Sequence, residues 1–155
     1  MIDHLTLTVR DAARTKAFYS AALAPLGYRV LMEFGEMFGM GDEKPYFWVK
    51  PGDPPTQPMH LAFVARDRPS VDAFYAAARA LGAPDNGAPG LRPDYHPHYY
   101  GAFVIDPDGH PIEAVCHAPP AAAKARPKAG KKAAKAKARP AKKAAAKKAK
   151  AGKRR

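Results

Sequence analysis

Hydrophobic and polar residues alternate at the start of the chain. In HLTLTV, Leu5, Leu7 and Val9 alternate with polar residues, of which His4 is the first. A period of two is typical of a strand with one apolar face. We predict that this apolar face packs against a helix, which leaves the side that carries His4 free to line a cleft.

The pattern then changes to helical spacing. Asp11 is a suitable N-cap, and apolar residues recur from Phe18 to Leu26 before Gly27, where we expect the helix to stop. Shorter β-rich pieces follow, namely YRVLMEF, GEMFGMG and PYFWVK.

The same order of patterns returns 56 residues later. HLTLTVRDAARTKAFYSAALA from His4 aligns without gaps with HLAFVARDRPSVDAFYAAARA from His60, and the second copy continues with YYGAFVID and PIEAVC. The copies end alike, since KPYFWVK around Phe47 resembles HPIEAVC around Glu113. We therefore predict an α+β fold of two βαβββ modules, at about residues 1–50 and 58–117.

Charge divides the chain into two unlike segments. The whole chain carries +12, but residues 1–117 hold 10 basic and 14 acidic side chains, whereas residues 118–155 hold 16 basic and none acidic. The second segment consists of Lys, Arg, Ala, Pro and Gly, with too little apolar surface to offset the entropy of ordering it. We expect one folded domain, 1–117, followed by a disordered basic tail, 118–155.

Several classes of protein are excluded by composition. No apolar run approaches the length of a membrane span, and the first residues carry charges where a signal peptide would be apolar. The single Cys116 allows no intrachain disulfide and is expected to be a small buried strand residue. These features predict a soluble cytoplasmic protein.

Three residues of metal-ligating type fall at related positions. His4 and His60 each precede a first strand, and Glu113 lies on the last strand of the second copy, pointing away from its apolar face. Two imidazoles and a carboxylate suit Fe, Mn, Zn or Ni and leave positions open for substrate. We interpret Phe47 as the counterpart of Glu113 in the first copy, where a phenyl ring cannot ligate.

The double repeat, the opening DHLTLTVRD and the stretch DPDGHPIE resemble the vicinal oxygen chelate superfamily, which includes glyoxalase I, bleomycin-resistance proteins and extradiol dioxygenases. The resemblance covers residues 1–117. It implies a U-shaped mixed sheet with helices on its outer face, divalent-metal ligands at His4, His60 and Glu113, and pairing into homodimers. Phe47 departs from the carboxylate of glyoxalase I, so the pattern is closer to that of the extradiol dioxygenases.

A second informative stretch, LRPDYHPHYY, precedes the strand next to Glu113. Its His and Tyr side chains could bind substrate or move a proton, or could form an aromatic loop packed over the cleft. We take as catalytic candidates Glu113, His96, His98 and Tyr100, and as substrate-binding candidates Phe47, Trp48, Tyr99 and Tyr100. Other apolar side chains are either cleft walls or core: Phe34, Met37, Phe38 and Met40.

The tail resembles, in composition alone, the lysine-rich tails of linker histones and bacterial histone-like proteins. A chain with this charge binds polyanions by releasing counterions. The expected polyanion-binding residues are Lys131, Lys132, Lys142, Lys143, Lys147 and Lys148. The alternative is a solubilising extension with no dedicated partner.

Three functions are compatible with these patterns. The first is a metal-dependent lyase or dioxygenase that chelates vicinal oxygens of a small substrate. The second is a non-catalytic protein of the bleomycin-resistance type that sequesters a ligand. The third is a nucleic-acid-associated protein that acts through its tail and lies at the nucleoid.

Overall fold

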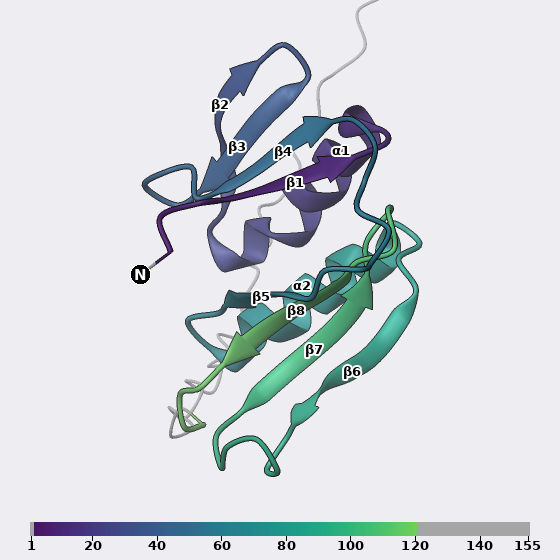
Figure 1. The fold of residues 1–155 in the computed structure, drawn as a ribbon. Coiled ribbons are helices and arrows are strands. Elements are labelled where there is room, and N and C mark those ends of the chain that lie inside the picture. The colour runs from purple at the N-terminus through teal and green to yellow at the C-terminus, as the bar shows by residue number, and fades with distance from the viewer. Residues whose placement is uncertain (1, 121–155) are drawn as a thin grey trace, which may run out of the picture. The chain divides into compact units, whose positions relative to one another are not determined.

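The first module forms the predicted βαβββ unit. The computed structural model describes residues 2–120, and the tail lysines named above lie outside them. Module 1 consists of β1 (Leu5–Val9), α1 (Ala12–Ala22), the short 3₁₀ helix η1 (Ala24–Leu26), β2 (Arg29–Phe34), β3 (Met37–Gly41) and β4 (Phe47–Pro51) (Figure 1). Its sheet has the order β1-β4-β3-β2, with β1 and β4 parallel and the other pairs antiparallel.

The second module repeats this topology. Module 2 consists of β5 (Leu61–Val64), α2 (Arg68–Ala80), β6 (Asp85–Leu91), β7 (Tyr100–Ile105) and β8 (Pro111–Cys116), with the sheet order β5-β8-β7-β6. β5 and β8 are parallel, and the other two pairs are antiparallel. The repeat in the sequence is therefore a repeat in structure.

Strand β6 is the element that the hydrophobic pattern did not reveal. Its sequence, DNGAPGL, has two glycines and a proline and no alternation of apolar residues. It lies at the edge of the sheet, where Pro89 need not donate to a neighbouring strand on both sides. An edge position thus explains why so poor a strand former pairs here.

The helices begin as predicted. The Asp11 carboxylate accepts from the Arg14 backbone N–H at 2.9 Å, and Asp67 caps α2 in the same way through Ser70 at 2.9 Å. Helix α1 ends at Ala22, earlier than the apolar spacing indicated, and Leu26 belongs to η1, which ends at Gly27 with φ 91°. The positive φ suits glycine at this position.

One hydrophobic core spans both modules. Leu7 and Val9 are buried on the helix side of β1, as their alternation predicted, and Cys116 is buried on β8. The Phe47 ring contacts the rings of Tyr19 and Phe63 at centroid distances of 4.9 and 5.4 Å. Since Phe63 belongs to module 2, this aromatic group joins the two sheets through their helix-side faces. Among residues 2–120 no helix is long and apolar enough to span a membrane.

Candidate metal and substrate site

The open side of module 2 carries the acidic candidate. In the strand register Ala62, Glu113 and Phe103 are direct partners in one row, whereas Ile112 and Ala114 lie in the core on the other side of β8. Because neighbouring residues of a strand point to opposite faces, Glu113 lies on the side away from α2, as expected. Figure 1 shows α2 behind this sheet, so that the viewer looks onto the open side.

Glu113 and His60 come together on this side. The distance from His60 Nε2 to Glu113 Oε2 is 3.0 Å, and the Glu113 side chain is 3% exposed while that of His60 is 54% exposed. The Phe103 ring lies against the imidazole, with centroids 6.3 Å apart. An imidazole nitrogen and a carboxylate oxygen that converge at the protein surface are two ligands of the predicted set.

The other oxygen of Glu113 has a fixed partner. The Tyr99 hydroxyl donates a short hydrogen bond to Glu113 Oε1. Burial, together with this hydrogen bond and the carboxylate charge, raises the pKa of Tyr99 above its ordinary value. Tyr99 therefore remains a donor at neutral pH and orients the carboxylate with Oε2 toward His60. The sequence placed Tyr99 among the substrate-binding residues and did not reveal this contact.

A glycine makes room for that arrangement. A Cβ atom at Gly101 on β7 would lie 3.0 Å from Glu113 Oε1 and 3.1 Å from the Tyr99 ring. Both contacts are tighter than ordinary van der Waals separation. The absence of a side chain at Gly101 thus allows Tyr99 to reach across β7 to the carboxylate.

His4 does not join this pair. Its side chain is 56% exposed, and its Nδ1 lies 2.8 Å from Asp3 Oδ1. The hydrogen bond and charge of His4 lower the pKa of Asp3. Among residues 2–120, no three His, Cys, Asp or Glu side chains are grouped closely enough to hold a metal ion. The predicted triad is therefore divided into a pair in module 2 and a single imidazole in module 1.

The strand register corrects the position assigned to Phe47. Leu5 pairs with Phe47 and Thr6 with Trp48 in module 1, while Leu61 pairs with Ile112 and Ala62 with Glu113 in module 2. Trp48, one residue later, is therefore the structural counterpart of Glu113. Phe47 is 3% exposed and lies in the core, and its role in substrate binding stays a prediction. The conclusion that module 1 has no carboxylate at this place still holds.

Aromatic side chains occupy the open side of module 1 instead. The rings of Trp48 and Phe34 stack at 6.2 Å with an interplanar angle of 20°, and Phe34 is 60% exposed. Met37, the strand partner of Phe34, lies on the same side. Phe38 and Met40 are buried in the core, so they are not cleft walls. Trp48 thus remains a substrate-binding candidate.

Tyr100 lies on the helix side of its sheet. Its strand partner is Cys116, on the helix side of β8, and its hydroxyl donates to Asp72 Oδ1 on α2 at 2.8 Å. Burial, followed by the hydrogen bond to Asp72, raises the pKa of Tyr100. Arg68 lies over its ring at 5.1 Å. The alternation along β7 thus turns Tyr100 toward the helix and away from Glu113, and its catalytic and substrate-binding roles stay predictions.

His96 and His98 lie in the exposed turn before β7. Their rings are 5.8 Å apart, His117 lies 6.0 Å from His96, and the Tyr99 ring lies 5.0 Å from His117. Neither His96 nor His98 is hydrogen-bonded to Glu113 or His60; instead His96 Nδ1 accepts from the His98 backbone N–H at 3.1 Å. Their catalytic role stays a prediction. Their position indicates that they flank the site through Tyr99.

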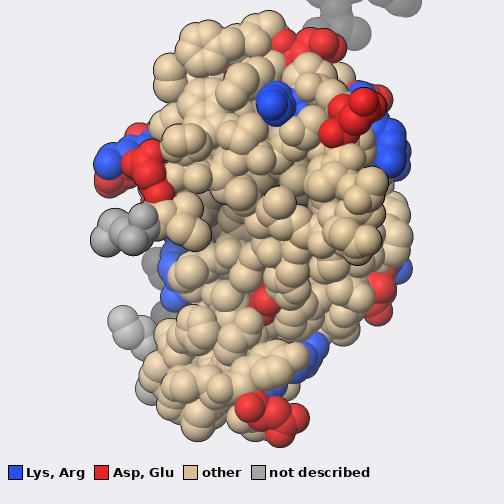
Figure 2. Space-filling view, in the orientation of Figure 1, with Lys and Arg blue, Asp and Glu red and all other residues tan. Residues whose placement is uncertain are grey.

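The face on which these residues lie carries little charge at its centre. Figure 2 shows that uncharged residues form most of the face seen in Figure 1, with Lys, Arg, Asp and Glu gathered mainly toward its edges. Large apolar side chains are exposed on the open sides of both sheets, with Phe34 60% and Val64 66% exposed. Exposed apolar surface of this kind is typical of a binding or pairing surface.

The fold agrees with what comparison with known proteins finds. Residues 1–114 match the model of the glyoxalase/bleomycin resistance protein/dioxygenase superfamily. The chain belongs to that superfamily. No curated protein matches the chain.

Solved structures extend this result. A glyoxalase/bleomycin resistance protein from Albidiferax ferrireducens T118 is 28% identical, with 74% of this chain and 96% of that one covered and a TM-score of 0.62. The fosfomycin resistance protein FosX of Listeria monocytogenes, solved with Mn(II) and 1S,2S-dihydroxypropylphosphonic acid, is 20% identical, with 74% and 88% covered and a TM-score of 0.59. Lactoylglutathione lyase from Agrobacterium tumefaciens is 18% identical, with 75% and 92% covered and a TM-score of 0.56. The last two are likenesses of fold.

Proposed function

We propose that this protein is a metal-dependent enzyme that acts on a small molecule with two neighbouring oxygens. The observation that carries the proposal is the 3.0 Å approach of His60 Nε2 to a Glu113 carboxylate that is 3% exposed. A carboxylate so deeply buried is costly unless its charge is neutralised, and a divalent ion between the imidazole and Oε2 would do so. The FosX structure, which resembles this chain in fold, was solved complexed with Mn(II).

The residues of one chain supply two of the three predicted ligands of a divalent metal. His60 and Glu113 supply one nitrogen and one oxygen ligand, which suits Mn, Fe, Zn or Ni. Tyr99 would hold the carboxylate in its binding orientation, because it occupies Oε1 and leaves Oε2 facing His60. When bound, the ion would act as a Lewis acid that polarises the substrate oxygens.

The third ligand would be His4 of a second copy of the chain. Within one chain His4 is exposed and apart from the pair, and apolar side chains are exposed on both open sheet faces. If the open side of module 1 from one copy faces that of module 2 from another, His4 and Trp48 complete the site. The substrate would then lie between the metal and the Trp48–Phe34 stack.

Metal content tests this function. Purified wild-type protein reconstituted with Mn(II), Fe(II), Zn(II) or Ni(II) should hold close to one ion per chain by mass spectrometry. His60→Ala and Glu113→Ala should lose it, whereas Tyr95→Phe, in an exposed tyrosine beside Tyr99, should keep it. Wild-type protein that takes up none of the four ions would contradict the proposal.

A sequestering protein is the second candidate function. The observation that favours it is Trp48 at the structural position of Glu113, stacked on an exposed Phe34. Three results together would support this function: the metal-free protein binds an aromatic or cationic compound tightly, Trp48→Ala loses this binding, and the compound is not turned over. Binding that requires metal would support the enzyme instead.

The basic tail carries a separate proposal. We propose that residues 118–155, with 16 basic and no acidic side chains, associate with nucleic acid without reading its sequence. Full-length protein should bind duplex DNA at low salt with an affinity that falls steeply as salt rises. A chain ending at residue 117 should lose this binding. Equal affinity of the two forms would contradict a role for the tail.

A further inference from the structure

The turn between β7 and β8 contains buried polar side chains that the proposed function leaves unexplained. Asp106 and His110 are 4% and 1% exposed. Asp106 Oδ1 accepts from the backbone N–H groups of His110 at 2.8 Å and Asp108 at 2.9 Å, and the Asp106 N–H donates to the His110 carbonyl at 2.9 Å. These bonds fix the backbone of the turn immediately before β8.

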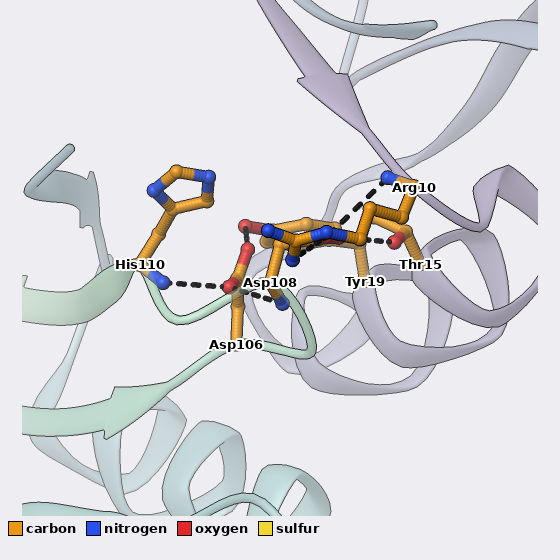
Figure 3. Close-up of polar contacts among 6 residues, drawn as sticks. All are labelled: Arg10, Thr15, Tyr19, Asp106, Asp108 and His110. Atoms are coloured by element: carbon orange, nitrogen blue, oxygen red, sulfur yellow. Dashed lines mark hydrogen bonds and ion pairs between the residues drawn. The ribbon is translucent and has the colours of Figure 1, made fainter. Parts of the chain in front are cut away.

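Module 1 holds this turn from one side (Figure 3). The Tyr19 hydroxyl donates to Asp106 Oδ2 at 2.8 Å, and the Arg10 backbone N–H and the Thr15 hydroxyl donate to Asp108 at 3.2 and 3.4 Å. Tyr19 is fully buried, and Asp108 is only 5% exposed as a side chain. The start of β8 is thus anchored to β1 and α1.

The His110 imidazole holds a different segment. Figure 3 shows its ring turned away from the Asp106 carboxylate. His110 Nδ1 accepts from the Met59 backbone N–H at 3.0 Å. Met59 directly precedes His60, and the next residue of β8, Pro111, has no N–H to donate. The imidazole therefore adds a hydrogen bond between the two strands at the place where both begin.

Packing alone does not account for an imidazole at this position. Since Nδ1 accepts, the ring proton must be on Nε2. His110 Nε2 is buried and has no hydrogen-bond partner among residues 2–120. A buried donor without a partner costs stability, and an apolar side chain of similar size would avoid that cost. The hydrogen bond to Met59 is the contact that an apolar residue could not make.

We propose that His110 is a positioning residue for the His60–Glu113 pair. By holding the Met59 backbone against the start of β8, it keeps His60 Nε2 within 3.0 Å of Glu113 Oε2. His110 is three residues before Glu113, and its imidazole is hydrogen-bonded to Met59 and not to the side chain of His60 or Glu113. The effect of His110 on metal affinity rests on the proposed function, but its effect on the positions of Met59 and His60 does not.

Two substitutions of nearly equal size separate the hydrogen bond from packing. In His110→Asn the side-chain oxygen takes the place of Nδ1, whereas His110→Leu has no acceptor. In the metal-free full-length protein, hydrogen exchange of the Met59 amide should quicken by about tenfold or more in His110→Leu, the factor expected for one lost hydrogen bond. His110→Asn should restore it to near the wild-type rate.

Metal affinity gives the second measurement. Calorimetric titration with Mn(II) should show roughly 10- to 100-fold weaker binding for His110→Leu, the usual effect of losing a residue that orients a ligand. His110→Asn should bind Mn(II) nearly as tightly as wild type. The His60 imidazole nitrogen chemical shifts should change in His110→Leu and not in His110→Asn.

Three results would overturn the proposal. One is unchanged Met59 exchange in His110→Leu; another is an equal effect of the two substitutions, which would assign His110 to packing. The third result comes from the wild-type protein and so can be obtained even if His110→Leu fails to fold. It is a set of nitrogen chemical shifts for the His110 ring that places the ring proton on Nδ1. Wild-type protein that takes up none of Mn(II), Fe(II), Zn(II) and Ni(II) would contradict the proposed function, while Met59 exchange would still decide the role of His110.

Discussion

Glu113 is buried on the open side of its sheet, and its two oxygens have different partners. Tyr99 donates to Oε1, and His60 lies beside Oε2. A hydroxyl whose pKa is raised by burial and by the neighbouring carboxylate stays protonated at neutral pH and so keeps its proton for this bond. The two contacts divide the carboxylate into one oxygen fixed by the protein and one available to a metal.

Tyr99→Phe should therefore weaken metal binding without removing a ligand. The phenyl ring keeps the packing against His117 and leaves Oε1 without its donor, so the carboxylate is no longer oriented. We expect Mn(II) affinity to fall by roughly tenfold, measured by calorimetry. Tyr95→Phe is the matched control, since Tyr95 is 69% exposed. Equal affinities of wild type and Tyr99→Phe would show that the hydrogen bond has no role in binding.

Because of Tyr19, the free energy of unfolding should depend on pH in the alkaline range. Burial first, and then the Asp106 charge, raise the pKa of Tyr19 well above its ordinary value. The unfolded chain loses the Tyr19 proton near pH ~10, while the folded chain retains it. Tyr19 therefore contributes its whole stabilising free energy below that pH, and this contribution is lost as pH rises further.

Tyr19→Phe tests this contribution. At neutral pH it should lower the free energy of unfolding by about 1–3 kcal/mol, because Asp106 loses a buried donor. Above pH ~10, denaturant titrations should show a shallower decline for Tyr19→Phe than for wild type. The same alkaline slope in both proteins would contradict the argument.

At the scale of the strand, β7 places Tyr99 and Tyr100 on opposite sides of the sheet. Tyr99 reaches Glu113 on the open side, and Tyr100 reaches Asp72 on α2. Gly101 then leaves the space that Tyr99 and Glu113 fill. The sequence LRPDYHPHYY showed the concentration of tyrosines but not which of two neighbours faces the site, because the strand begins only at Tyr100.

Gly101→Ala should disturb this packing. The new methyl group would lie 3.0 Å from Glu113 Oε1, so the carboxylate must move, at a cost of about 1–3 kcal/mol in unfolding free energy. In a Glu113→Ala background the same substitution should cost less, because the oxygen is gone. Denaturant titration of the four proteins gives the coupling, and strictly additive effects would show that the two residues do not interact.

The assignment of elements from sequence was correct where the periodicity was strong. Both first strands, both capped helices and both last strands form as predicted, while β6 was missed because Gly and Pro interrupt its pattern. The alignment of PYFWV with PIEAV was wrong by one residue, and the register places Trp48 opposite Thr6. A shift of one residue moves a side chain to the other face, so similarity of letters could not decide it.

At the scale of the whole molecule, module 1 and module 2 share a core and a polar junction. Arg10, Thr15 and Tyr19 hold the β7–β8 turn, and the helix-side faces of both sheets meet around Phe47 and Phe63. With these faces buried inside one chain, the open faces that carry His4 and Glu113 remain apart. This arrangement is what motivates a site shared between two copies.

Mixing of two inactive variants tests that arrangement. His4→Ala and His60→Ala proteins should each fail to bind metal. Suppose that each site takes His4 from one copy and His60 with Glu113 from the other. Dissociation and reassociation of an equal mixture should then restore about a quarter of the wild-type sites. About half of the dimers are mixed, and each mixed dimer has one intact site of its two. Metal content measures the recovery. If mass spectrometry shows mixed dimers but metal binding does not recover, all ligands of a site lie in one chain.

The sequence by itself determined the repeat, the α+β class, the boundary in charge near residue 117 and the residue types of the site. These are consequences of periodicity, capping and composition, which are local. The tertiary structure alone decided that Trp48 and not Phe47 corresponds to Glu113, that Tyr99 and not Tyr100 contacts the carboxylate, and that His4 lies apart. Register, the facing of side chains and the packing of modules depend on contacts between residues far apart in the chain, which no local pattern encodes.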